Sequence, residues 1–188
     1  MERKTRARLR AGDPAAFSEL FDEHAQAIYR YAARTTGDWA AAEDVVSLTF
    51  LEAWRLRGRL EPEGDSVVPW LFGIATNVLR NKTRATRRHR AALSRIPPGD
   101  PVPDFADELV GRFEDAQRVE AAHTALAQLS STDREIITLC VWAGLDYAGT
   151  AEALGIPVGT VRSRLSRART RLRELTKTTM QKTMQGEN

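Results

Sequence analysis

Hydrophobic residues recur every three to four positions through the first half of the chain, which is the period of amphipathic α-helices. The dipeptide Asp13-Pro14 predicts the start of a helix over residues 14–34, and a second helix is expected over residues 39–57. After a loop that contains Gly and Pro, a third helix is expected to start at residue 65 or 66. Since no stretch shows the two-residue alternation of a strand, the pattern predicts an all-α fold.

The same helical period returns in the second half of the chain. Apolar positions between Val119 and Leu129 predict one helix. Thr132 and Glu135 have the spacing of a capping box before an apolar run, so they predict the start of the next helix.

A helix-turn-helix pattern follows. A short helix over residues 147–154 is expected to end at Gly155, and Pro157 is expected to open the next helix. A short helix, a turn containing Gly and a basic helix are the parts of this DNA-binding motif. The tail over residues 177–188 is polar and is expected to fray.

The helix after Pro157 combines a narrow apolar stripe with unbalanced positive charge. The stripe consists of Val161, Leu165, Ala168 and Leu172. Six arginines share the remaining positions, with no acidic residue before Glu174: Arg162, Arg164, Arg167, Arg169, Arg171 and Arg173. Such a helix fits the major groove of DNA, with arginines on phosphates and small side chains near the bases. The alternative is an ordinary solvated amphipathic helix.

A second basic region follows the start of the third helix. Residues 80–95 contain seven Arg or Lys residues and no carboxylate. Trp70, Asn77 and Asn81 are expected near the same surface, where an indole and two amides suit unstacked bases. The alternative for Trp70 is packing in the core.

Composition and charge divide the chain into four parts. Residues 96–115 are rich in Pro and acidic residues and are expected to form a flexible linker. The predicted architecture is therefore two small helical domains, 1–95 and 116–176, joined by the acidic linker 96–115 and followed by the tail 177–188. With one cysteine and a mean hydropathy of −0.41, the sequence predicts a cytoplasmic protein without a membrane span.

The sequence offers little for catalysis. The three histidines are scattered, Cys140 is the single cysteine, and no Gly-rich loop for phosphate is present. The carboxylates of Glu43, Asp44 and Glu135 are accompanied by no nucleophile. We therefore expect no catalytic residues, no metal, no cofactor and no small-molecule substrate.

Four blocks, in this order, resemble the extracytoplasmic-function group of bacterial RNA polymerase sigma factors. DPAAFSELFDEHAQAIYRYA is similar to the start of sigma region 2, and AEDVVSLTFLEAW to its part that binds the β′ clamp helices. PWLFGIATNVLRNKTRATRR is similar to the part that melts and reads the minus-ten element. GLDYAGTAEALGIPVGTVRSRLSRARTRLRE is close to the region 4 helix-turn-helix that reads the minus-thirty-five element.

The resemblance implies three sets of site residues. The core-polymerase set is Asp44, Val45, Ser47, Leu48, Phe50, Leu51 and Trp54. The minus-ten set is Trp70, Asn77, Arg80, Asn81 and Arg84. The minus-thirty-five set is Thr160, Arg162, Ser163, Arg164 and Arg167.

The resemblance also implies the function and the partners. The chain would bind core RNA polymerase through the β′ clamp and β flap, direct it to promoter DNA, and be held by an anti-sigma factor. The linker would thread towards the polymerase active-site channel. Two alternatives remain: a free-standing helix-turn-helix regulator, and a sigma-like decoy that binds polymerase without opening promoters.

Overall fold

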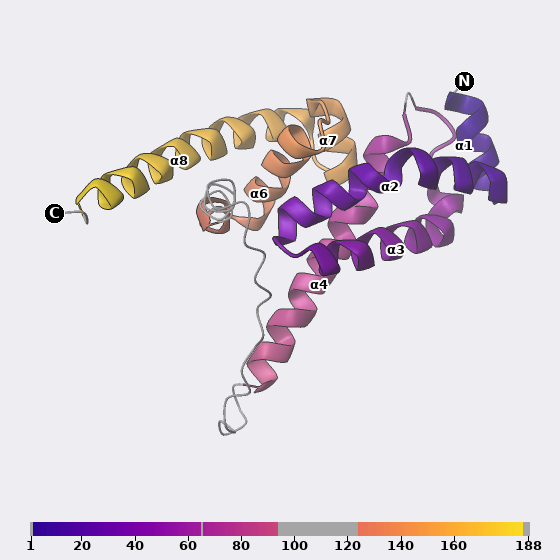
Figure 1. The fold of residues 1–188 in the computed structure, drawn as a ribbon. Coiled ribbons are helices and arrows are strands. Elements are labelled where there is room, and N and C mark those ends of the chain that lie inside the picture. The colour runs from indigo at the N-terminus through magenta and orange to yellow at the C-terminus, as the bar shows by residue number, and fades with distance from the viewer. Residues whose placement is uncertain (1, 65, 94–123, 186–188) are drawn as a thin grey trace.

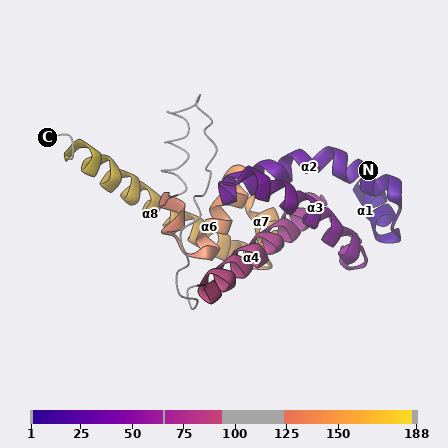
Figure 2. The ribbon, with the colours of Figure 1, turned by 60° about the horizontal axis from the view of Figure 1, so that its bottom comes forward.

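The computed structural model describes residues 2–64, 66–93 and 124–185, and these ranges contain helices and turns but no strand. The predicted acidic linker, residues 96–115, lies outside the described residues. The elements, in chain order, are α1 (Glu2–Ala11), α2 (Pro14–Thr36), α3 (Trp39–Leu56), the 3₁₀ turn η1 (Arg57–Arg59), α4 (Val68–Leu93), α6 (Ser131–Ile137), the π-helical turn η2 (Thr138–Trp142), α7 (Tyr147–Leu154) and α8 (Val158–Gln185). Helix α1 and the end of α8 lie at opposite ends of the molecule (Figures 1 and 2).

Local caps fix the helices of the first half. The Asp13 carboxylate accepts a hydrogen bond from the Ala15 amide at 2.9 Å and starts α2. Gly37, at φ 72°, ends α2 in the left-handed conformation that favours glycine. Asp38 then caps α3 through the Ala41 amide at 2.9 Å. The predicted helices over residues 14–34 and 39–57 are thus confirmed, whereas α1 was not separately predicted.

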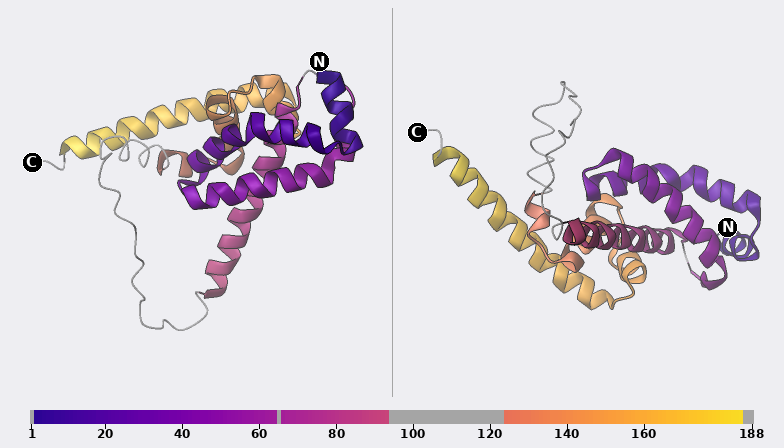
Figure 3. Two further views of the ribbon diagram at one scale, coloured as in Figure 1. Left: turned by 45° about the vertical axis from the view of Figure 1, so that its right-hand side comes forward. Right: turned by 90° about the horizontal axis from the view of Figure 1, so that it is seen from below.

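The core of the first half lies between α2, α3 and α4. Helices α2 and α3 lie side by side, and the end of α4 projects away from the other helices (Figures 1 and 3). Buried apolar side chains fill the space between them, including Ile28, Val45 and Leu71. The buried hydroxyl groups of Tyr31 and Thr76 satisfy each other at 3.0 Å.

The second half has its own core between α6, α7 and α8. Ile136, Val161 and Leu165 are buried there, as the apolar stripe of the basic helix predicts. Asp146 caps α7 through the Gly149 amide at 2.7 Å, and Gly155, at φ 65°, ends it. The predicted short helix over residues 147–154 and its turn are therefore confirmed.

Two local predictions for the second half are wrong. The start of α6 is capped by Ser130, whose hydroxyl accepts from the Asp133 amide at 3.2 Å, and not by Thr132. Because Ser130 and Asp133 already provide a cap with this spacing, Glu135 is free to pair elsewhere. The tail was expected to fray after Lys177, but α8 continues to Gln185.

The two halves pack directly against each other through α4 and α7. Gly73 of α4 is buried, and a Cβ atom added there would lie 2.7 Å from the carbonyl oxygen of Ala153 in α7. A Cβ atom added at Gly149 of α7 would likewise lie 3.2 Å from Cγ of Pro69 in α4. Leu139 of η2 is fully buried and joins the core of the first half. The two halves of the described structure are therefore joined by a close-packed contact.

Candidate polymerase and promoter interfaces

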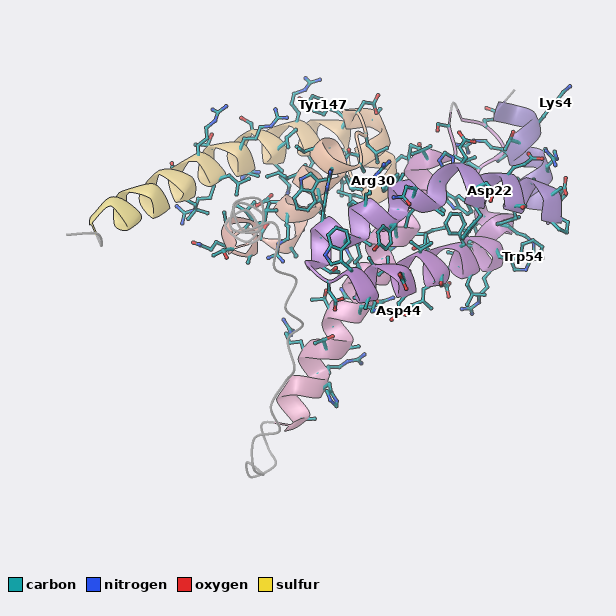
Figure 4. All side chains as sticks on the ribbon, in the orientation of Figure 1. Lys4, Asp22, Arg30, Asp44, Trp54 and Tyr147 are labelled. Carbon is teal, nitrogen blue, oxygen red and sulfur yellow. The ribbon has the colours of Figure 1, made fainter. Side chains whose placement is uncertain are left out.

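An apolar strip runs along the outer side of α3. Leu48, Leu51 and Trp54 are 40%, 55% and 36% exposed, large fractions for apolar side chains within a helix. Asp44 and Ser47 are also exposed on this helix. Asp44 and Trp54 lie towards opposite ends of α3 (Figure 4).

Two members of the predicted polymerase-binding set point inward. Val45 is fully buried, because α3 directs Ala42, Val45, Thr49 and Ala53 towards the core at helical spacing. The structure therefore removes Val45 from the surface. Phe50 is half-buried, and its ring packs against Phe21 of α2 with 4.8 Å between the centroids.

Aromatic contacts hold the exposed strip in place. The Trp54 indole meets the Phe17 ring edge-on, with 4.8 Å between the ring centroids. The guanidinium carbon of Arg57 also lies over the indole, 4.6 Å from its centroid. Phe21, which is 45% exposed, extends the strip onto α2. Phe21 was not among the predicted site residues, and the one sign of it in the sequence is an aromatic residue beside the buried face of the helix.

The predicted minus-ten residues share one face of α4. Asn77, Asn81 and Arg84 are exposed, and Arg80 lies between them at helical spacing. Trp70 lies further towards the start of the helix, where it is half-buried and packs against the core, as in the alternative interpretation.

Arg80 joins this face to the second half. Its Nε and Nη2 donate to Glu135 Oε1 and Oε2, both at 2.6 Å, and its Nη1 donates to Asn77 Oδ1 at 3.1 Å. The bonds to the Glu135 carboxylate raise the pKa of Arg80, so the guanidinium stays charged. Glu135, for which the sequence predicted a capping role, is thus an interdomain partner.

A pocket of about 340 Å³ lies beside the minus-ten face. Its wall includes Trp70 and Asn77, two residues of the predicted minus-ten set. The loop between α3 and α4 and the end of α7 also contribute to its lining. The remaining lining residues are Arg6, Leu56, Arg59, Leu60, Glu61, Gly73, Ile74, Glu152 and Ala153.

The outer face of α8 carries the predicted minus-thirty-five residues. Arg162, Ser163 and Arg167 are exposed, and Thr160 is half-buried. Arg164 differs from them, because its Nη1 donates to Asp133 Oδ1 of α6 at 3.1 Å. Arg164 therefore helps to fix α8 on α6, while the exposed members remain free to meet a duplex.

The helix-turn-helix also brings an aromatic ring to this face. The guanidinium carbon of Arg162 lies 6.0 Å from the centroid of the Tyr147 ring, which belongs to α7. Tyr147 lies along the upper side of the molecule in Figure 4. Its ring limits the orientations of Arg162 at the start of the basic helix.

The structure shows neither a metal cluster nor a membrane helix among the residues that it describes. Within those ranges no three His, Cys, Asp or Glu side chains are grouped so that they could hold a metal ion. Likewise, none of the described helices is both long and apolar enough to cross a membrane.

Comparison with known proteins matches both halves of the chain. Residues 20–89 match the family described as Sigma-70 region 2, and residues 120–172 match the one described as Sigma-70, region 4. The chain is 39% identical over 160 residues to the ECF RNA polymerase sigma factor SigL of Mycobacterium tuberculosis, covering 82% of this chain and 85% of SigL. It is 35% identical over 171 residues to the RNA polymerase sigma factor CarQ of Myxococcus xanthus, covering 89% of this chain and 93% of CarQ.

Solved structures show the same fold. The sigma factor RpoE of Bartonella quintana, solved with the anti-sigma factor NepR, is similar with a TM-score of 0.63 and 28% identity, over 86% of this chain and 96% of that one. CnrH, solved with the cytosolic domain of CnrY, has a TM-score of 0.69 at 24% identity, over 94% of this chain and 97% of CnrH. On these matches, which cover both halves and most of the chain, the protein belongs to the extracytoplasmic-function family of RNA polymerase sigma factors.

Proposed function

We propose that this chain binds core RNA polymerase and directs it to promoters that have a minus-ten and a minus-thirty-five element. The observation that carries the proposal is the presence, on one chain, of an exposed apolar strip on α3 and two separate basic helical faces on α4 and α8. The chain would itself catalyse no reaction and would act in the cytoplasm, where polymerase and promoter DNA meet.

The strip on α3 supports binding to polymerase. Leu51 and Trp54 offer apolar surface that folding leaves uncovered, and tryptophan is one of the residues that most often dominate the binding free energy at protein interfaces. The partner would be the β′ clamp, with Asp44 and Ser47 at the polar edge of the contact. Contact with the β flap would come from the second half.

The two basic faces support binding to DNA at two places. The exposed arginines of α8 can contact phosphates on either side of a major groove, with Ser163 near the base edges. On α4, Asn77 and Asn81 can meet the bases of a separated strand, and the neighbouring pocket can hold an unstacked base. Because these contacts are electrostatic, promoter binding should weaken steeply as salt increases.

The docked arrangement supports an anti-sigma factor as a further partner. In the present structure Glu152 and Ala153 of α7 line the pocket beside the minus-ten face, and Glu135 binds the Arg80 guanidinium. A protein that binds both halves in this arrangement would prevent the basic faces of α4 and α8 from binding promoter DNA. RpoE of Bartonella quintana was solved in complex with an anti-sigma factor, NepR.

The function can be tested by transcription from fragmented genomic DNA with core polymerase, with and without the chain. We expect transcripts that depend on the chain and start at discrete sites, preceded by two shared elements at a fixed spacing. Transcript starts that do not change on addition of the chain would contradict the proposal. DNA binding without co-purification with polymerase would instead favour the free-standing regulator.

A further inference from the structure

A buried arginine holds the loop between η1 and α4 from inside the molecule. Arg6, on α1, is only 1% exposed. Its Nη1 donates to the carbonyl oxygens of Glu61 at 2.8 Å and Glu63 at 3.2 Å, and its Nη2 donates to that of Ser66. One planar guanidinium thus ties three backbone carbonyls of a short loop to a helix more than fifty residues earlier in the chain.

The loop backbone fits closely around this guanidinium. Gly64 has φ +145°, and a Cβ atom added there would lie 2.5 Å from Arg6 Nη2. Both the conformation and the space therefore require glycine. At the end of the loop, the Ser66 hydroxyl accepts from the Val68 amide, the first of α4, at 3.1 Å. One of the three carbonyls that Arg6 holds therefore belongs to the residue that binds the start of α4.

The same loop forms one wall of the pocket beside the minus-ten face. Leu60 and Glu61 line the pocket, and the side chain of Arg6 also reaches it. Trp70 and Asn77 of α4 line the same pocket. Because the loop and α4 both line the pocket, a shift of the loop would change the shape of the pocket, and Arg6 fixes where the loop lies.

We propose that Arg6 is a positioning residue for minus-ten recognition: it holds loop residues 60–64 and 66 so that the pocket against Trp70 and Asn77 accepts one unstacked base. This inference rests on the proposed function, because it assumes that α4 meets a separated promoter strand. Arginine suits the role because its fixed fork serves several carbonyls at once. Lysine presents a single flexible ammonium and cannot reproduce that geometry.

The test compares Arg6→Met, Arg6→Lys and the control Arg8→Met in the full chain bound to core polymerase. Arg8 lies on the same helix, but its guanidinium pairs with Asp13 and Glu19 and not with the loop. The probes are a labelled single strand that carries the minus-ten element and copies in which each base in turn is replaced by an abasic site. The measured quantity is the ratio of affinities for the intact and abasic strands.

For wild type and Arg8→Met, we expect one position at which removal of the base weakens binding about tenfold, as is typical when one captured base is lost. For Arg6→Met this ratio should fall close to one, with Arg6→Lys between the two. Affinity for core polymerase and for a minus-thirty-five duplex should stay unchanged. Gly64→Ala keeps the arginine but places a methyl group against its guanidinium, so it should break the contact with the loop and cause the same selective loss. This variant provides the test if Arg6→Met does not fold.

Unchanged base discrimination in folded Arg6→Met, or in folded Gly64→Ala, would overturn the inference. A parallel loss of polymerase affinity, duplex affinity and base discrimination would also overturn it, because Arg6 would then only stabilise the fold. In both cases wild type would still direct transcription. Failure of the proposed function itself would instead appear as wild type that directs no promoter-specific transcript.

Discussion

Arg80 and Glu135 lie 55 residues apart in the sequence and form a bidentate ion pair between α4 and α6, with both N–O distances at 2.6 Å. The two side chains are 36% and 15% exposed, so the pair is only partly screened by water. Since Arg80 lies on the proposed minus-ten face, this pair joins the two halves through a residue that DNA would otherwise contact. Binding to a promoter strand should therefore compete with the contact between the halves.

We expect Glu135→Gln to strengthen binding of the free chain to a single-stranded minus-ten oligonucleotide by about three- to tenfold, because a charged partner of Arg80 is removed. Fluorescence anisotropy of a labelled strand measures this change. The matched control is Glu19→Gln, which removes the same charge from an exposed pair with Arg8. An affinity that rises equally in both variants would show that only net charge matters.

A second way to separate the halves leaves every charge in place. Gly73→Ala places a methyl group against the Ala153 carbonyl, and a backbone atom so close cannot rotate away. Alanine favours the helix over glycine by about 1 kcal/mol, so α4 itself should not be weakened. We expect a larger distance between probes on α3 and α8, measured by energy transfer, and tighter binding of the minus-ten strand. Unaltered energy transfer would argue that the contact adjusts without opening.

The apolar strip on α3 gives a prediction for polymerase binding. Leu51→Ala should weaken binding to core polymerase about tenfold, as expected for truncation of an apolar interface residue. Its thermal stability should be nearly unchanged, because Leu51 is already 55% exposed. Trp39→Ala is the control, since Trp39 is 67% exposed but lies at the other end of α3, outside the proposed surface. An equal loss of polymerase affinity in both variants would contradict the proposal that the strip on α3 binds polymerase.

The arginines of α8 should separate into two kinds. Arg167→Ala should lower the slope of log affinity against log salt for a minus-thirty-five duplex by about one, because it removes one phosphate contact. Arg164→Ala should leave that slope unchanged and cost at most about 1 kcal/mol of stability, since its pair with Asp133 is partly exposed. Isothermal titrations at several salt concentrations and thermal unfolding measure the two effects. If Arg164→Ala alone changed the slope, Arg164 and not Arg167 would be the residue that contacts a phosphate.

The cap of α2 gives a prediction on pH. The bond from Arg8 lowers the pKa of Asp13 in the folded chain. The ionised Asp13 carboxylate therefore contributes its full stability above the pKa of about 3.9 that it has in the unfolded chain. This contribution is lost as the pH falls through the lower pKa of Asp13 in the folded chain. We expect the unfolding temperature to fall less steeply between pH 5 and 3 in Asp13→Asn, which can still cap the helix, than in wild type. Parallel curves would show that the pairing with Arg8 does not contribute.

The sequence was most informative where the cause of the structure is local. Asp13, Asp38, Asp146 and Gly155 cap or end helices through neighbours within a few residues, and the apolar period fixes which face turns inward. For the same reason the helix-turn-helix and the buried stripe of α8 were predicted correctly. The cap of α6 was predicted at Thr132 and lies at Ser130, because both residues have a suitable acidic residue three positions later and the local pattern does not separate them.

Tertiary structure alone decided how these helices serve a site. In the sequence, Arg6 is one of several charged residues in a polar first helix. It becomes a buried donor only because a loop fifty-five to sixty residues later in the chain folds around it. The burial of Val45 and the exposure of Phe21 depend on how α2 and α3 meet. Periodicity and caps act over one or two turns, and so the sequence determined the helices and their charges. Contacts between distant segments depend on the whole packing, which is why only the folded chain shows Glu135 on Arg80 and α7 against Gly73.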